Sequence, residues 1–252
     1  MLEARAGYLW GFNEIRFRDG DNANIPPTVQ EVGLDSIIFG LQGETFATED
    51  LAVRAQAWMN VPQDSRSDFI LDRRALGWDT QARYVQADLA AIYHIGLRGM
   101  PYAAGLVAGA RYNNFDYMSK RVGAPGGTFN DHMHVYIPYT GVYYAHNEFL
   151  GSVVRLDVFF SPFTFSRLDA SQNLANTSMQ VDGHSLTGCW FETLFEWSAS
   201  VGESALIGAV AKYDYLVLSG GATLNQAGAS TRFSMDSWHS LLVVGLGFTY
   251  MF

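Results

Sequence analysis

The last fifteen residues of the chain alternate between two kinds of side chain. Large apolar residues occupy every second position except Ser240, whereas the positions between them are smaller and mixed. A repeat of two is the period of a β-strand, whose successive side chains point to opposite faces. Segment 238–252 is therefore predicted to be a strand with one large apolar face, made of Trp238, Leu242, Val244, Leu246, Phe248, Tyr250 and Phe252.

Alternating or β-rich segments recur along the whole chain, and no segment sustains the 3.6-residue period of a helix. The predicted strands are 2–18, 29–46, 51–62, 82–98, 101–119, 132–146, 147–166, 184–200, 204–219 and 232–252. Short turns at 47–50, 97–101, 145–148 and 201–204 alternate with long polar loops at 18–30, 63–81, 120–131, 167–183 and 219–228. This pattern predicts an all-β chain: one closed, ten-stranded antiparallel transmembrane β-barrel, residues 1–252, with short periplasmic turns and five longer extracellular loops.

The charged residues test this fold separately, because lipid at one face of a strand forbids charge there whereas a lumen permits it. On the predicted strands, charges occupy the face opposite the aromatic side chains. The alternative, a water-soluble barrel, would need an interior larger than ten strands can enclose to hold those rings. We expect the charges to pair across a narrow lumen that is closed to free diffusion. The predicted lumen network is Glu3, Arg5, Arg54, Asp88, Arg111, Arg155, Asp157, Glu192, Glu196, Lys212 and Asp214.

Composition narrows the classes of function. The net charge of -9, with no basic patch, argues against binding to nucleic acid. The longest apolar run, 99–110, is shorter than the ~18 residues that a membrane helix needs. The single cysteine, Cys189, excludes an intrachain disulfide and argues against a zinc cluster. Met1 leads directly into strand-like sequence, so for an exported protein we expect a mature chain with an added initiator Met.

Three runs of the sequence, 80–115, 137–160 and 188–215, together with the last strand, resemble the omptin outer-membrane proteases in order and spacing. The likeness covers about two-thirds of the chain and lies mostly in barrel strands; the IPYTG run at 137–141 and the TQ pair at 80–81 are its least generic parts. The resemblance implies an omptin-like barrel in a Gram-negative outer membrane, at the cell surface.

The same resemblance implies a protease site, but its motifs are not matched. Omptins place an Asp-x-Asp pair opposite an Asp-x-His dyad, with a water between them as nucleophile. The segment expected to carry the pair has Asp64, Asp68 and Asp72 without an Asp-x-Asp, and Ser171 stands where the dyad's His is expected. The nearest literal Asp-x-His is Asp182 and His184. If the chain is a protease, the expected catalytic residues are Asp182, His184, Asp64 and Asp68.

Other residues suggest partners rather than catalysis. His132 and His134 share one strand face, as metal ligands do, but no third ligand is evident, so we predict a polar loop-to-strand junction and neither a metal nor another cofactor. Arg16, Arg18 and Lys120 lie at the long-loop rim, where cations can pair with lipid phosphates. Omptins bind lipopolysaccharide as a family, so we expect outer-membrane lipid, including lipopolysaccharide, as a partner.

The final Phe252 resembles the C-terminal signal by which the bacterial assembly machinery selects barrels, so that machinery is a further expected partner. We expect a non-enzymatic surface, structural or binding protein with an extracellular ligand or protein partner that the sequence does not identify. Two alternatives remain: a divergent omptin-type endoprotease, and a narrow, substrate-specific channel lined by Arg5, Arg54, Arg111 and Arg155.

Overall fold

Antiparallel β-strands make up nearly the whole of the described chain, as the alternating side chains predict. The computed structural model describes residues 1–18, 28–71, 74–95, 101–121, 127–149, 152–174, 177–226 and 229–251, so Phe252 lies outside the described residues. The strands are β1 (Leu2–Arg18), β2 (Thr28–Gly33), β3 (Ser36–Phe46), β4 (Leu51–Asn60), β5 (Gln63–Leu71), β6 (Arg74–Ile95), β7 (Tyr102–Arg121), β8 (Thr128–Phe149), β9 (Ser152–Leu174), β10 (Thr177–Ser200), β11 (Ala205–Gln226) and β12 (Ala229–Tyr250).

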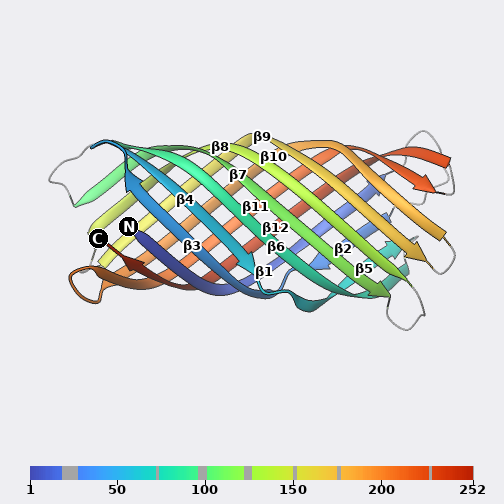
Figure 1. Cartoon of the computed structure of the whole chain (residues 1–252), viewed down its shortest axis with the longest axis horizontal. Coiled ribbons are helices and arrows are strands. Elements are labelled where there is room, and N and C mark those ends of the chain that lie inside the picture. Colours follow the sequence, from blue (N-terminus) through green and yellow to red (C-terminus); the bar gives the residue numbers. More distant parts are fainter. Residues whose placement is uncertain are drawn as a thin grey trace.

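The sheet closes on itself, because β1 pairs with β12 along the whole length of β1 (Figure 1). At the end that carries both termini, which we call the terminal half, the ring is β1-β3-β4-β6-β7-β8-β9-β10-β11-β12. In the opposite half, the far half, β2 and β5 take the places of β3 and β4. Ten strands therefore surround the interior at each level, although the described residues form twelve strands.

Two additional strands account for the difference from the ten predicted strands, because the predicted strand 29–46 is two strands and β5 lies within the predicted loop 63–81. The predicted strand 29–46 is divided at residues 34–35 into β2 and β3. The predicted strand 51–62 ends at Asn60, and β5 begins after Pro62. Proline has no N–H to donate to a ladder, so a strand is readily broken there.

Three predicted loops are wrong, because strands run through them. Within 63–81, 167–183 and 219–228, only residues 72–73, 175–176 and 227–228 separate the strands. Continuous ladders join β5 to β6 and β11 to β12 in this region. The predicted turn at 145–148 is also displaced, since β8 continues to Phe149 and β9 begins at Ser152. The strands therefore extend much further into the far half than the sequence pattern predicts.

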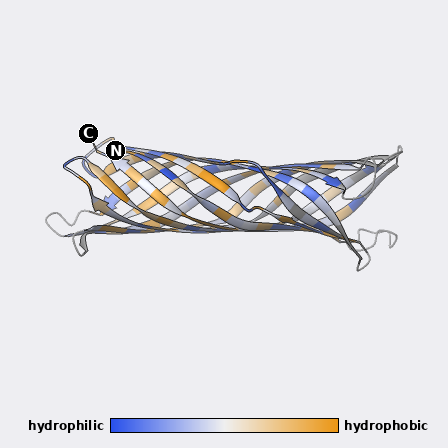
Figure 2. Cartoon of the chain, turned by 90° about the horizontal axis from the view of Figure 1, so that it is seen from below, coloured by the Kyte–Doolittle hydropathy of each residue, from blue (hydrophilic) through white to orange (hydrophobic). Residues whose placement is uncertain are grey.

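The two faces of the sheet change character along the strands. On β11, the buried face carries Lys212 and Asp214 in the terminal half and then Leu216 and Leu218 in the far half. The exposed face of β1 carries Trp10 and Phe12 and then the polar pair Glu14 and Arg16. Figure 2 shows hydrophobic colour gathered towards the terminal end and hydrophilic patches towards the other end. No helix among the described residues is long and apolar enough to cross a membrane.

Candidate functional site

The interior of the terminal half holds a network of buried ion pairs. Strand alternation places its members, because each lies on the face of its strand that points into the ring. Each of the eleven residues of the predicted lumen network forms an ion pair with another member of that set. The structure adds Glu44 of β3, whose carboxylate lies 3.8 Å from Nη1 of Arg155. Glu44 shares the inward parity of Gln42, which was the signal in the sequence that could have found it.

Arg111 of β7 is the centre of one group of charges. Its Nε lies 2.9 Å from Oδ2 of Asp88, and its Nη2 donates to Oε1 of Glu192 at 2.9 Å. A third carboxylate, on Asp214, lies 3.3 Å from Nη1. Lys212 supplies a second positive charge, with Nζ 3.0 Å from Oε2 of Glu192. Five charged residues on the four strands β6, β7, β10 and β11 are thus joined across the interior.

Further hydrogen bonds occupy the remaining oxygens of this group. The Tyr139 hydroxyl donates to Oδ1 of Asp88 at 2.7 Å, and Nε1 of Trp190 donates to Oδ1 of Asp214 at 2.8 Å. A buried ion pair recovers its desolvation cost only when its other donors and acceptors are also satisfied. The ion pairs and hydrogen bonds therefore hold these charged side chains in place, and none of the carboxylates named here is left without a partner.

A second group lies closer to the terminal end. Arg5 of β1 binds Glu3 through two nitrogens, at 2.7 and 2.8 Å, and also contacts Glu196 of β10. Asp157 of β9 is shared by two guanidinium groups, with Nη1 of Arg54 at 2.9 Å and Nε of Arg155 at 2.8 Å. Arg54 and Asp157 are almost completely buried, at 1% and 0% exposure, so these charges depend on each other rather than on water.

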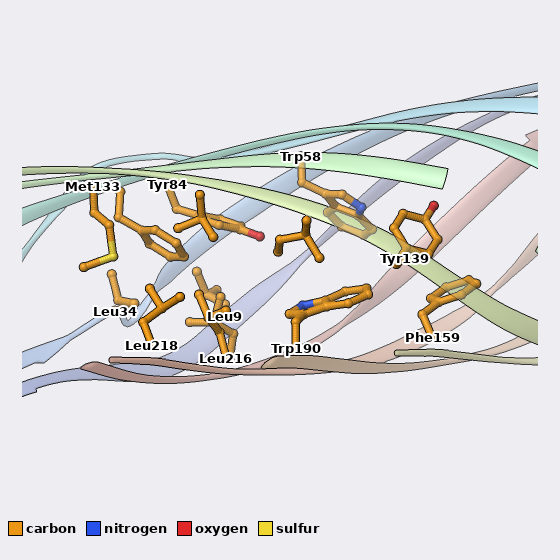
Figure 3. Packing of buried hydrophobic residues seen from close by; sticks show 14 of the residues in the cluster. Leu9, Leu34, Trp58, Tyr84, Met133, Tyr139, Phe159, Trp190, Leu216 and Leu218 are labelled. Atoms are coloured by element: carbon orange, nitrogen blue, oxygen red, sulfur yellow. The ribbon is translucent and has the colours of Figure 1, made fainter. Parts of the chain in front are cut away.

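Aromatic rings fill the space between the charged side chains. The guanidinium carbon of Arg111 lies 4.4 Å from the ring centre of Trp190, and that of Arg54 lies 5.3 Å from the ring centre of Phe159. The rings of Phe159 and Trp190 are stacked, with centres 6.5 Å apart. Figure 3 shows Trp58 reaching into the same space from the other wall. Cations over aromatic faces stabilise one another when both are shielded from water, so charge and ring together fill this section.

Apolar side chains dominate the interior of the far half, with a few buried polar groups among them. Leu34, Met133 and Leu218 belong to one continuous buried cluster (Figure 3). Within it, Nε2 of Gln30 donates to Oδ2 of Asp131 at 3.0 Å. Burial raises the pKa of the Asp131 carboxyl to about 7. Sequence reasoning missed this residue because it placed Asp131 at the end of a loop.

The predicted catalytic residues are not brought together among the described side chains. Asp64 is exposed on β5, where its Oδ1 accepts a hydrogen bond from Gln81 at 2.8 Å. Asp68 has the same parity and is half-buried, whereas the intervening Ser67 is buried in the interior. The backbone of Asp182 and His184 belongs to β10, but their side chains lie outside the described part of the structure, as does Asp72. The described side chains therefore include only Asp64 and Asp68 of the predicted catalytic set, and the pairing of these acids with Asp182 and His184 stays a prediction.

The rim cations predicted from the sequence lie on the outer face. Arg16 is paired with Glu14 and lies over the ring of Trp238, with the guanidinium carbon 4.7 Å from the ring centre. Lys120 is exposed on β7. The side chain of Arg18 lies outside the described residues. On the outer faces of their strands, both described cations thus stand beyond the last large apolar side chain, Phe12 on β1 and Met118 on β7.

Comparison with solved structures identifies the fold. The chain is similar to the outer membrane protease OmpT from Escherichia coli, with a TM-score of 0.79 and 10% sequence identity over 99% of this chain and 96% of OmpT. The translocator domain of the autotransporter NalP from Neisseria meningitidis is less similar, with a TM-score of 0.43 and 12% identity over 99% of this chain and 88% of that domain. No family model and no curated protein matches the sequence. The predicted likeness to an omptin is confirmed for the fold, and a shared fold does not by itself establish a shared activity.

Proposed function

We propose that the chain is a bacterial outer-membrane β-barrel of ten strands at each level, which acts at the cell surface as a non-enzymatic structural or binding protein. The terminal half spans the bilayer and the far half projects outside the cell, with both termini in the periplasm. Exposed apolar side chains such as Leu89, Phe160 and Leu246 support the placement of the terminal half in the bilayer, because they would be costly in water and are favourable in lipid.

The filled interior is the observation that carries the non-enzymatic proposal. In the terminal half, Arg54, Arg111 and Trp190 are at most 2% exposed, and the far half is filled by apolar residues. A conducting pore needs a continuous water-filled path, and a hydrolase needs an interior cleft that admits both substrate and water. A pocket of about 100 Å³ lined by Glu3, Arg155 and Glu196 lies near the terminal end, and the buried charges and rings beyond it leave little room for a substrate. The surface of the far half is therefore the part that we expect to meet a partner.

Two assays test the proposal against its alternatives. Detergent-folded protein should give no stepwise conductance in planar bilayers; regular steps would favour the narrow channel. The same protein, mixed with lipopolysaccharide, should not cleave a fluorogenic peptide that contains paired basic residues. Turnover that is lost in His184→Ala would favour a divergent omptin-type endoprotease instead. The orientation is tested by protease treatment of intact cells, which should cut the far half only.

Lipopolysaccharide is the lipid partner that the exposed rim cations favour. Arg16 and Lys120 stand where outer-leaflet phosphates would lie in this orientation, and each could form a charge-assisted hydrogen bond. The double variant Arg16→Ala and Lys120→Ala should reduce the stabilisation that lipopolysaccharide gives to the folded barrel. Lipid A without phosphates should stabilise the wild type and the double variant equally. Equal stabilisation of both proteins by intact lipopolysaccharide would rule out these contacts.

A further inference from the structure

Two histidines stand side by side on the outer face of β8, just beyond its apolar segment. His132 and His134 are separated by one residue, so both point away from the interior, whereas the intervening Met133 is fully buried. The next outward side chain towards the terminal end is Tyr136, which is 55% exposed. Two residues of a strand span roughly 6–7 Å, and both imidazoles project from the same face of the sheet at this spacing.

Each imidazole is held through Nδ1 by a residue of the neighbouring strand β7. Nδ1 of His132 lies 2.9 Å from Oδ1 of Asp116, and Asn114 in turn donates to Oδ2 of that carboxylate at 3.0 Å. Nδ1 of His134 lies 2.7 Å from the Tyr112 hydroxyl, and the two rings are stacked with an interplanar angle of 14°. These contacts engage Nδ1 of each ring and leave Nε2 as the nitrogen through which it would bind a metal ion.

We propose that His132 and His134 form a binding site for one divalent transition-metal ion of the zinc, nickel or copper type. Imidazole nitrogens suit these ions, whereas magnesium and calcium prefer oxygen. Histidine ligands typically donate their second N–H to a carboxylate or another acceptor, which fixes the ring and makes it a better ligand. Asp116 and Tyr112 occupy those supporting positions, with water completing the coordination.

The neighbouring groups limit the site to two protein ligands. Asp169 of β9 lies opposite His132 in the register, but its carboxylate is 3.0 Å from Nε of Arg167. Among the described residues, no group of three His, Cys, Asp or Glu side chains is placed to hold a metal ion. The site is therefore expected to bind an ion reversibly at the surface rather than to stabilise the fold as a closed structural centre does.

Equilibrium dialysis tests the proposal, using tag-free protein in detergent with Ni²⁺ in a buffer that does not chelate metals. We expect one ion per chain for the wild type, a loss of at least tenfold in affinity for His132→Ala and for His134→Ala, and no comparable binding of Mg²⁺. His146→Ala, near the terminal end of the same strand, is the matched control and should bind as the wild type does. Asp116→Asn should weaken binding by about 10–100-fold while retaining both ligands.

Two further measurements make the result independent of folding. Heat-modifiable mobility on gels confirms that each variant is folded, and His132→Asn and His134→Asn replace any alanine variant that is not. With Cu²⁺ in place of Ni²⁺, electron paramagnetic resonance should show two coordinated nitrogens in the wild type and one in each single variant. Wild-type binding by a variant that carries both His132→Ala and His134→Ala, or an equal loss of binding in His146→Ala, would overturn the proposal.

Discussion

Replacing Asp131 by Asn should stabilise the far half at neutral and alkaline pH. Asp131 is fully buried, and its Oδ2 accepts one hydrogen bond, from Gln30. Its Oδ1 and the Oε1 of Gln30 have no hydrogen-bond partner. A proton on Oδ1 can satisfy both oxygens at once, which is a geometric reason why the carboxyl retains its proton. The amide of an Asn at this position would offer the same donor at every pH.

The size of the effect follows from the pKa. Burial raises the pKa of Asp131 from an ordinary value of 3.8 to about 7. A difference of about three between the two pKa values corresponds to a free-energy difference of ~4 kcal/mol between the protonated and the ionised form. Because the pKa is raised in the folded state, this stabilisation is fully present below about pH 4 and is lost as the pH rises to about 7. Asp131→Asn should remove this part of the pH dependence.

Urea unfolding in detergent micelles between pH 4 and pH 8, followed by tryptophan fluorescence, measures the difference. The variant should exceed the wild type in stability at pH 8, and the gap should narrow steadily towards pH 4. Asp79→Asn, an exposed change in the same half, is the control and should follow the wild type at every pH. Hydrogen exchange of the β8 amides locates the effect in the far half. A variant that is less stable than the wild type at pH 8, or equally pH-dependent, would refute the argument.

Three more changes test other parts of the molecule. Arg111→Met leaves three carboxylates without their shared guanidinium and should cost about 3–5 kcal/mol in urea unfolding, whereas the exposed Arg16→Met should cost under about 1 kcal/mol. Gly40→Ala would bring a methyl group within 2.7 Å of the Trp58 ring and should cost about 1–3 kcal/mol, with altered tryptophan fluorescence. Leu246→Arg, on the apolar outer face, should cost about 2–4 kcal/mol of folding in lipid vesicles; unchanged folding yield would contradict a lipid-facing position.

The strands were predicted most accurately from the sequence where one face of a strand is apolar and the other is not. The alternation in 238–252 predicts the course of β12 up to Tyr250, since Leu242 and Val244 are exposed and Val243 is buried between them. The same parity argument selected the charges of the interior. It could not give their pairing, because contacts such as Arg111 with Glu192 join strands 81 residues apart and depend on the register of the strands between them.

The far half was poorly predicted for a physical reason. Hydrophobic alternation is the main sequence signal for a strand, and it vanishes where polar residues lie on both faces. On β5, Asp64 is exposed and the inward Ser67 is also polar, so the segment reads as a loop although it pairs with both β2 and β6. Because these strand segments were not predicted, the burial of Asp131 and the surroundings of His132 were not predicted either. Both residues lie in the part of β8 that extends into the far half.

The change from apolar to polar along the outer face fixes how deeply the molecule can sit in a bilayer. A shift along the strands by two residues, roughly 5 Å along the membrane normal, would lift Phe165 and Tyr136 into water or draw Arg16 and Arg167 into hydrocarbon. Either displacement is unfavourable. The bilayer must therefore thin or thicken around the protein when its hydrocarbon core and the apolar band of the protein differ in thickness. The protein therefore imposes its own immersion level on the lipid around it.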